Sequence, residues 1–153
     1  MFHRNIFDPA KAYIVAGVYR NVNPAEDQHN HRRLIRALAN RGISYQECRG
    51  GYTHDNGHRV EEQSVAFPAE RFREFREDGF FAGQEAVLTV SRRDHSAYFG
   101  GAVGPRHVML TYLDGRPPVY HGVWQSVSFA EAMAAPGFTY LGDEIERSYY
   151  IAA

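Results

Sequence analysis

The stretch Gly50-Gly-Tyr-Thr-His-Asp-Asn-Gly-His-Arg-Val-Glu-Glu-Gln-Ser-Val-Ala-Phe67 predicts two strands joined by a tight turn. Asn56-Gly57 favours a hairpin because both residues tolerate a positive φ. The returning strand carries two adjacent carboxylates, Glu61 and Glu62, although acidic residues are unfavourable in strands. Because side chains alternate along a strand, one of them points to solvent and the other to a packed or ligand-facing side.

A carboxylate on that packed side needs a partner, because an unpaired buried charge is very costly. Tyr52, on the opposing arm of the hairpin, is a candidate neighbour. The alternative is an edge hairpin with two solvated surface glutamates. A pairing shift of one residue exchanges Glu61 and Glu62, so the sequence leaves open which of them faces a ligand.

The segments around the hairpin predict alternating strands and helices. Residues 12–19 are a near-continuous apolar run, typical of a central strand. Asn23 is the expected N-cap of a helix that runs to about Asn40, and Pro68 opens a second helix that Gly83 ends. With residues 84–92 as the next strand, the order is β-α-β-β-α-β. This order predicts an α+β, ferredoxin-like antiparallel sheet with the helices packed on one face.

The second half of the chain is mostly β. The expected strands are residues 95–101, 106–113 and 119–127. Residues 145–151 are either a last strand or an extended arm. Ser128 and Glu131 match a capping box for a short helix that Pro136-Gly137 terminates. We therefore expect extra C-terminal strands on the ferredoxin-like sheet, all within a single domain over residues 1–153.

Composition excludes several classes of function. A net charge of −1 gives no basic field for nucleic acid, and Arg32, Arg33 and Arg36 fit a solvated helix face or a contact with a neighbouring subunit's acids. The single cysteine, Cys48, excludes an internal disulfide and fits a reducing cytosol. No apolar run has the length of a membrane span, and no signal-peptide core follows Met1. We expect a cytoplasmic protein that binds neither nucleic acid nor membrane.

The eight histidines invite a metal site, but their spacing does not support one. His54, Asp55 and His58 flank the turn without the spacing of a zinc pattern. His29 and His31 are two residues apart on a predicted helix, so they do not share a face. The sequence also lacks a nucleophile elbow, a Walker motif and a dinucleotide-binding glycine pattern. We therefore expect no metal site.

Several stretches of the chain resemble, in the same order, the phage-encoded S-adenosylmethionine lyase family, formerly called S-adenosylmethionine hydrolases. They are Tyr13–Tyr19 with Arg20-Asn21, His31-Arg32 with Leu34, Gly51-Tyr52 with Glu61-Glu62-x-x-Val65, Ala86–Val90 with His95-Ser96-Ala97, and Gly137-Phe138-Thr139 with residues 143–147. The likeness spans most of the chain, and the tyrosine, glutamate and valine pattern is its most specific part. A family of uncharacterised bacterial proteins shares the helix, glycine and Glu-x-Ser pattern.

The resemblance implies a ferredoxin-like subunit in a homotrimer, with substrate bound between neighbouring subunits and no cofactor. It implies cleavage of S-adenosylmethionine to 5′-methylthioadenosine and L-homoserine lactone, which would deplete the host's supply and counter restriction and methylation. The functional glutamate and tyrosine would be Glu62 and Tyr52. On this reading Glu62 holds the substrate ammonium, whereas the older hydrolase reading makes Glu62 a general base for water.

The other candidate substrate-binding residues are Glu61, Ser64, Val65, His95, Ala97 and Tyr98. Backbone around Ser64-Val65, and around Ala97-Tyr98 of a neighbouring subunit, is expected to contact substrate. His95 follows a turn, so an exposed turn histidine is the alternative. The alternative function is a non-catalytic phage protein of the same fold that sequesters a nucleotide or blocks a host enzyme.

Overall fold

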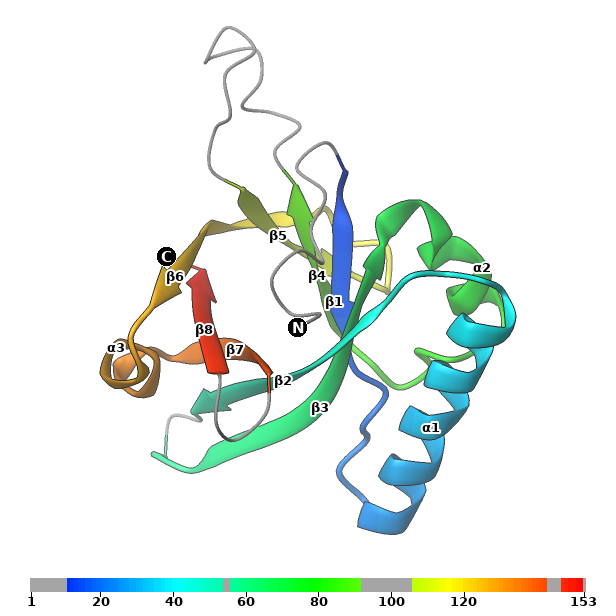
Figure 1. Cartoon of the computed structure of the whole chain (residues 1–153), viewed down its shortest axis with the longest axis horizontal. Helices are drawn as coiled ribbons and strands as arrows, with labels where there is room; N and C mark the ends of the chain where they lie inside the picture. The colour runs from blue at the N-terminus through cyan, green and yellow to red at the C-terminus, as the bar shows by residue number, and fades with distance from the viewer. Residues whose placement is uncertain (1–10, 54–55, 92–105, 143–146, 153) are drawn as a thin grey trace, which may run out of the picture.

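The strands of the computed structural model close into one antiparallel barrel (Figure 1). The structure describes residues 11–53, 56–91, 106–142 and 147–152. Around the barrel the strand order is β1-β3-β2-β7-β8-β6-β5-β4, and β4 pairs with β1 to complete the ring. The strands are β1 (Tyr13–Ala16), β2 (Gln46–Thr53), β3 (Arg59–Pro68), β4 (Ala86–Ser91), β5 (His107–Tyr112), β6 (Val119–Val127), β7 (Gly137–Gly142) and β8 (Arg147–Ala152).

The ferredoxin-like prediction is wrong, because the sheet is closed rather than open. Four strands of the N-terminal half lie in the order β4-β1-β3-β2, so an open sheet would leave β2 and β4 as edges. In the barrel β2 pairs with β7, and β4 pairs with β5. The C-terminal strands therefore join the two edges of the N-terminal sheet, and closure removes both edges at once.

The helices lie outside the barrel. Helix α1 (Pro24–Asn40) and helix α2 (Phe72–Glu77) cover one side, and α3 (Phe129–Ala134) lies at the opposite side (Figure 1). The N-cap prediction is confirmed, because Asn23 Oδ1 accepts hydrogen bonds from the backbone N–H of Ala25 and Glu26 at 2.9 and 3.2 Å. In the described part of the chain, no helix is both long and apolar enough to cross a membrane.

Two other predictions about the helices have different outcomes. The capping box of α3 is confirmed, because Glu131 N donates to Ser128 Oγ and Ser128 N donates to Glu131 Oε1, each at 3.1 Å. The second helix is shorter than predicted, because α2 follows the 3₁₀ turn η2 (Ala69–Arg71) and ends at Glu77. Gly79, with φ of 83°, turns the chain there before Gly83 is reached.

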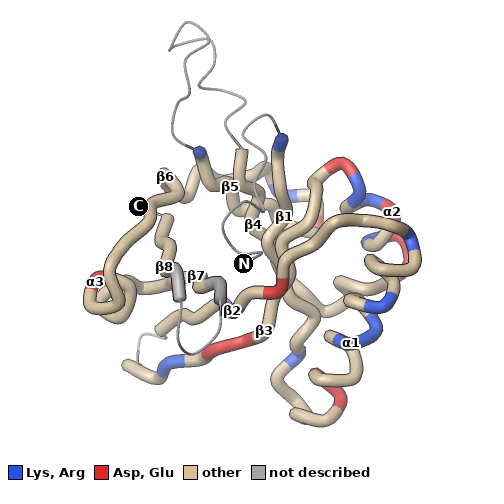
Figure 2. The backbone as a smooth tube through the Cα atoms, viewed as in Figure 1, with Lys and Arg blue, Asp and Glu red and all other residues tan. Residues whose placement is uncertain are grey.

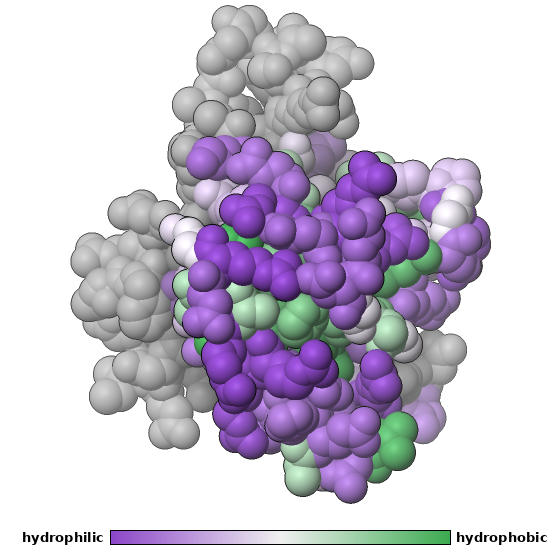
Figure 3. All heavy atoms as spheres, turned by 90° about the vertical axis from the view of Figure 1, so that its right-hand side faces the viewer, coloured by the Kyte–Doolittle hydropathy of each residue, from purple (hydrophilic) through white to green (hydrophobic). Residues whose placement is uncertain are grey.

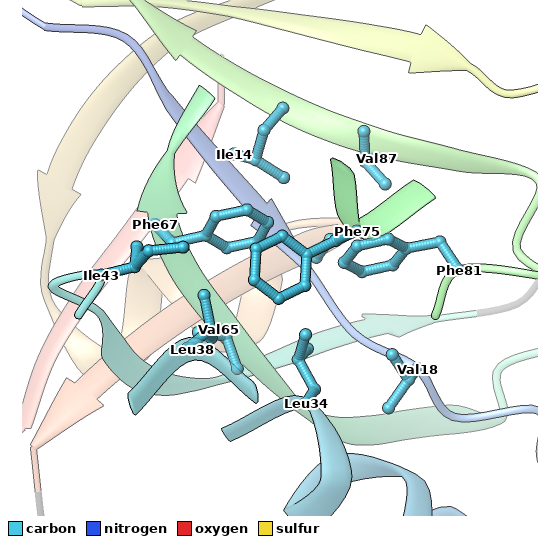
Figure 4. Packing of buried hydrophobic residues seen from close by; sticks show 11 residues of the cluster. Ile14, Val18, Leu34, Leu38, Ile43, Val65, Phe67, Phe75, Phe81 and Val87 are labelled. Carbon is cyan, nitrogen blue, oxygen red and sulfur yellow. The ribbon is translucent and has the colours of Figure 1, made fainter. Parts of the chain in front are cut away.

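The largest apolar core lies between the barrel wall and helices α1 and α2 (Figure 4). From β3, Val65 and Phe67 project into this core and are fully buried. Leu34 and Leu38 of α1 and Phe75 of α2 pack against them. The outer surface on this side of the molecule is mostly hydrophilic (Figure 3), so the helices bury their apolar stripe against the sheet.

The opposite faces of the strands form a second core inside the barrel. Val15, Cys48, Ala66, Val90, Val108 and Trp124 belong to it, and they come from six strands around the ring. Burial raises the pKa of the Cys48 thiol to about 12, so at neutral pH it is an uncharged thiol that packs as a small apolar side chain. Along β3, Ala66 therefore faces inward and Val65 faces the helices. Strand alternation places Ser64 and Glu62 on the inner face.

Candidate functional site

A cavity of about 810 Å³ occupies the barrel interior, a volume typical of small-molecule sites. Every strand contributes to its wall. One lining residue from each, in chain order, is Val15, Gly50, Glu62, Leu88, Leu110, Trp124, Thr139 and Tyr150. The wall is thus apolar over much of its area and carries charged or hydroxyl groups at particular positions.

Only one of the two adjacent glutamates of β3 lines the cavity. Glu62 is half-buried and lines the cavity, whereas Glu61 is exposed and does not line it. Figure 2 shows the acidic positions as a red segment of β3. Ser64 also lines the cavity, while the Val65 side chain lies in the core under the helices. The cavity therefore brings together Glu62 and Ser64, and it leaves the side chains of Glu61 and Val65 outside.

Tyr52 lies on the same inner face as Glu62. Gly50 is paired opposite Glu62 and Tyr52 opposite Val60, so the tyrosine is a diagonal cross-strand neighbour of the glutamate. Its side chain lines the cavity and is 41% exposed. Burial raises the pKa of the Tyr52 phenol, and the Glu62 carboxylate raises it further. At neutral pH the phenol is therefore protonated and able to donate a hydrogen bond.

Asn21 holds the Glu62 carboxylate in place, a role that the sequence did not reveal. Asn21 Nδ2 donates to Glu62 Oε1 at 2.5 Å. The backbone of Asn21 has a φ of 59°, in the left-handed region that asparagine tolerates better than most residues. The signal in the sequence was Arg20-Asn21 directly after the first apolar run, which entered only as part of the family resemblance.

Asp27 fixes the conformation of this turn. Its carboxylate accepts hydrogen bonds from the backbone N–H of Arg20 at 2.8 Å and of Asn21 at 3.2 Å. The residue is only 4% exposed, so both bonds lie in a region shielded from water. The structure adds a chain of contacts from Asp27 through Asn21 to Glu62.

A second set of hydrogen bonds anchors the residue before this turn. Tyr19 Oη donates to Gln63 Oε1 at 2.7 Å, and Gln28 Nε2 donates to the same oxygen at 2.7 Å. Gln84 Nε2 donates to the Tyr19 carbonyl oxygen at 2.5 Å. Strand β3, helix α1 and the segment before β4 thus all fix the backbone that leads to Asn21.

The histidines that were weighed as metal ligands do not form a cluster where they are described. Among residues 11–53, 56–91, 106–142 and 147–152, no group of three or more histidine, cysteine or acidic side chains has the geometry to hold a metal ion. His31 is buried, and its Nε2 lies 2.8 Å from Glu47 Oε1 on β2. His54 and Asp55, and likewise His95, Ala97, Tyr98 and the strand predicted at 95–101, lie outside the described residues.

The charges along the cavity favour a ligand with a positive group at one end. Glu62, Glu85 and Arg20 line the wall, but Glu85 Oε1 is already paired with Arg116 Nη2 at 3.0 Å, so Glu62 carries this argument. The Nε of Arg20 donates to the Ala82 carbonyl oxygen at 3.1 Å, so this group is partly engaged by the protein itself. Apolar and aromatic side chains make up much of the remaining wall, together with polar side chains such as Ser64, His121 and Thr139. The cavity thus suits a molecule with a cationic end and a flat or apolar end.

The sequence model of the S-adenosylmethionine lyase family matches residues 14–153. The match runs from the second residue of β1 through β8, so it includes nearly the whole barrel and every described residue of the cavity wall. A comparison with curated proteins finds no match. The resemblance seen in the sequence is confirmed by the family match, and the chain belongs to the S-adenosylmethionine lyase family.

Proposed function

We propose that this lyase binds S-adenosylmethionine in the barrel cavity and cleaves it to 5′-methylthioadenosine and L-homoserine lactone. Family membership establishes S-adenosylmethionine lyase activity and its small-molecule substrate. The observation that carries the proposed site is that Glu62 and Tyr52, adjacent on one inner face, line a cavity of about 810 Å³. A cavity of this size accommodates a ligand as large as S-adenosylmethionine.

The proposed reaction needs only the atoms of the substrate. A carboxylate oxygen of the methionine arm attacks its own γ-carbon, which forms the fifth bond of the lactone ring. The bond between that carbon and the sulfonium sulfur breaks, and its electron pair returns to sulfur as a neutral thioether. Since nucleophile and leaving group belong to one molecule, holding the arm folded supplies much of the acceleration.

The cavity wall favours this charge change. A carboxylate and a sulfonium neutralise each other in the transition state, so a site with little water stabilises it relative to the separated charges. The apolar side chains of Val15, Leu88 and Leu110 line the same cavity as Glu62 and Tyr52. We propose that these side chains exclude water from the reacting atoms.

Glu62 and Tyr52 have separate roles in this proposal. The Glu62 carboxylate holds the α-ammonium of the substrate, and Asn21 keeps that carboxylate at a fixed position through its 2.5 Å hydrogen bond. The Tyr52 ring and hydroxyl orient the substrate cation. No general base is required, because the nucleophile is already a carboxylate.

The predicted oligomeric state, cellular location and phage role of this protein come from the family resemblance. A homotrimer, in which backbone of Ala97-Tyr98 from a neighbouring subunit contacts substrate, stays a prediction. So do the cytoplasmic location and the phage role of depleting S-adenosylmethionine to counter host restriction and methylation. The predicted depletion depends on turnover, because a protein that only sequesters substrate removes no more of it than its own concentration.

Mass spectrometry of the products tests the proposed reaction. Purified protein is incubated with S-adenosylmethionine and EDTA in ¹⁸O-labelled water. We expect 5′-methylthioadenosine and homoserine lactone free of solvent oxygen, because both lactone oxygens come from the substrate carboxylate. Homoserine as the initial product, with ¹⁸O incorporated, would instead support Glu62 as a general base for water. Unchanged substrate would favour the non-catalytic binding protein.

Truncating Tyr52 tests its part in orienting the substrate. We expect Tyr52→Ala to lower kcat/KM by roughly 10- to 100-fold, through loss of a cation–π contact and a hydrogen bond. Tyr52→Phe keeps the ring, so we expect a loss below about tenfold. The matched control is Tyr45→Ala, since Tyr45 is 37% exposed and does not line the cavity. Equal kcat/KM for Tyr52→Ala and Tyr45→Ala would contradict a substrate contact.

A further inference from the structure

A single row of residues crosses the inner wall of the barrel from Glu62 to an aromatic pair. Glu62 on β3 is paired opposite Gly50 on β2, and Gly50 is paired opposite Thr139 on β7. Thr139 is in turn paired opposite Tyr150 on β8. All four of these residues line the cavity. The row therefore has a carboxylate at one end and an aromatic ring at the other.

The aromatic end of the row is a stacked pair. Tyr150 and Trp124 lie with their ring centroids 5.1 Å apart and their planes 11° from parallel. Both line the cavity, and Trp124 is the only tryptophan in the chain. Two nearly parallel aromatic rings that border a cavity are a favourable surface for another flat π system.

We propose that the Trp124–Tyr150 pair is the subsite that stacks the purine ring of the substrate, at the far end of the row from Glu62. This inference rests on the proposed function. It assigns the two ends of the ligand to the two ends of the row, with the ammonium at Glu62 and the adenine at the ring pair. A purine suits this end because every nucleobase has a π face and stacking requires no charged partner.

The length of the row agrees with this assignment. Three strand intervals separate Glu62 from Tyr150, and at about 4.8 Å each they span roughly 14 Å along the wall. The straight distance across a curved wall is shorter. S-adenosylmethionine carries its ammonium and adenine at opposite ends, and the proposed reaction needs only its carboxylate to fold back toward the γ-carbon, so the molecule can still span a length of this order. The methionine arm and ribose then lie over Gly50 and Thr139.

Gly50 supplies independent support, because the protein itself does not require glycine there. Its φ is not in the left-handed region, and an added Cβ would be 3.7 Å from Ser64 Oγ and 3.9 Å from the Phe138 carbonyl oxygen, which are ordinary contacts. The neighbouring Gly51 differs, since a Cβ there would lie 2.5 Å from the Phe138 ring. Absence of a side chain at position 50 keeps the row open for a ligand.

Tryptophan fluorescence tests the subsite directly, because Trp124 is the sole emitter of its kind. The full chain is titrated with 5′-methylthioadenosine, which keeps the purine and lacks the amino-acid arm, and with L-homoserine, which lacks the purine. We expect a saturable fluorescence change with the first ligand and none with the second. A change only with L-homoserine, or with neither ligand, would overturn the assignment.

Two substitutions of Tyr150 separate stacking from packing. We expect Tyr150→Leu to raise the Kd for 5′-methylthioadenosine by roughly 10- to 100-fold, the usual effect of losing a stacking partner. Tyr150→Phe keeps the ring and should restore wild-type affinity. Glu62→Gln should leave this Kd unchanged, because the ligand lacks the ammonium. An unchanged Kd in Tyr150→Leu, measured by calorimetry, would refute the stacking role.

Gly50→Ala keeps the inference testable if Tyr150→Leu does not fold. The added methyl group should raise KM for S-adenosylmethionine without lowering Tm, and an unchanged KM would contradict the proposed path of the ligand. Turnover measured on the same preparations distinguishes the two proposals. Turnover with no dependence on Tyr150 would refute the subsite alone, whereas ring-dependent binding without turnover would refute the proposed function alone.

Discussion

Glu62→Gln is expected to lower kcat/KM for S-adenosylmethionine by roughly 10²- to 10³-fold, the effect of removing one partner of a buried ammonium–carboxylate pair. Glutamine has nearly the same shape and retains an amide oxygen that can accept the hydrogen bond from Asn21 Nδ2. We therefore expect the circular dichroism spectrum and Tm to match those of the wild type. Steady-state kinetics and thermal melting measure the two effects separately.

The adjacent residue provides a matched control. Glu61→Gln makes the same chemical change one position away, on the exposed face of β3. We expect its kcat/KM to equal that of the wild type. If both variants lost activity equally, the net charge of the strand rather than a contact in the cavity would be responsible. If Glu62→Gln unfolded the protein, the role of Glu62 would be structural and our assignment wrong.

Phe67→Ala is expected to cause the largest loss of stability, about 3–5 kcal/mol in the free energy of unfolding. Phe67 is fully buried, and its ring centroid lies 5.5 Å from that of Phe75 and 6.3 Å from that of Phe81 (Figure 4). Removing the ring leaves a cavity where β3 meets α2. At this chain length the loss corresponds to a fall in Tm of roughly 6–20 °C.

Phe129→Ala is the control for this substitution, because Phe129 is 60% exposed at the start of α3. Denaturant titration and calorimetry should show a much smaller loss for it, since little apolar area returns to water. Equal destabilisation by the two variants would mean that the cluster around Phe67 is not the main core. Phe67→Leu should give an intermediate stability and serves if the alanine variant does not fold.

Local features of the fold could be read from the sequence because their causes are local. The N-cap at Asn23 and the capping box of Ser128 and Glu131 each involve atoms within a few residues of one another. The hairpin of β2 and β3 follows from the Asn56-Gly57 turn and two strand-forming arms. Strand β6 lies at its predicted bounds, Val119–Val127, for the same kind of reason.

Features that depend on distant partners were missed. Strand β7 (Gly137–Gly142) was not predicted, because Pro136-Gly137 indicated only the end of a helix. Its pairing with β2 joins residues that are far apart in the chain. Barrel closure depends on this pairing and on that of β4 with β5, so the local pattern gave an open sheet instead.

The candidate site also has features that the sequence reveals and features that depend on distant partners. The sequence by itself pointed to Tyr52 and to the adjacent pair Glu61 and Glu62, and it supported the family, because residue types and their order can be read without coordinates. Only the tertiary structure chose Glu62 over Glu61, because the direction of a strand side chain depends on register. The tertiary structure also joined Asn21 to Glu62, and aligned Glu62 with the Trp124–Tyr150 pair across one wall of the barrel. These arrangements arise from long-range strand pairing and chain turns, which no short stretch of sequence encodes.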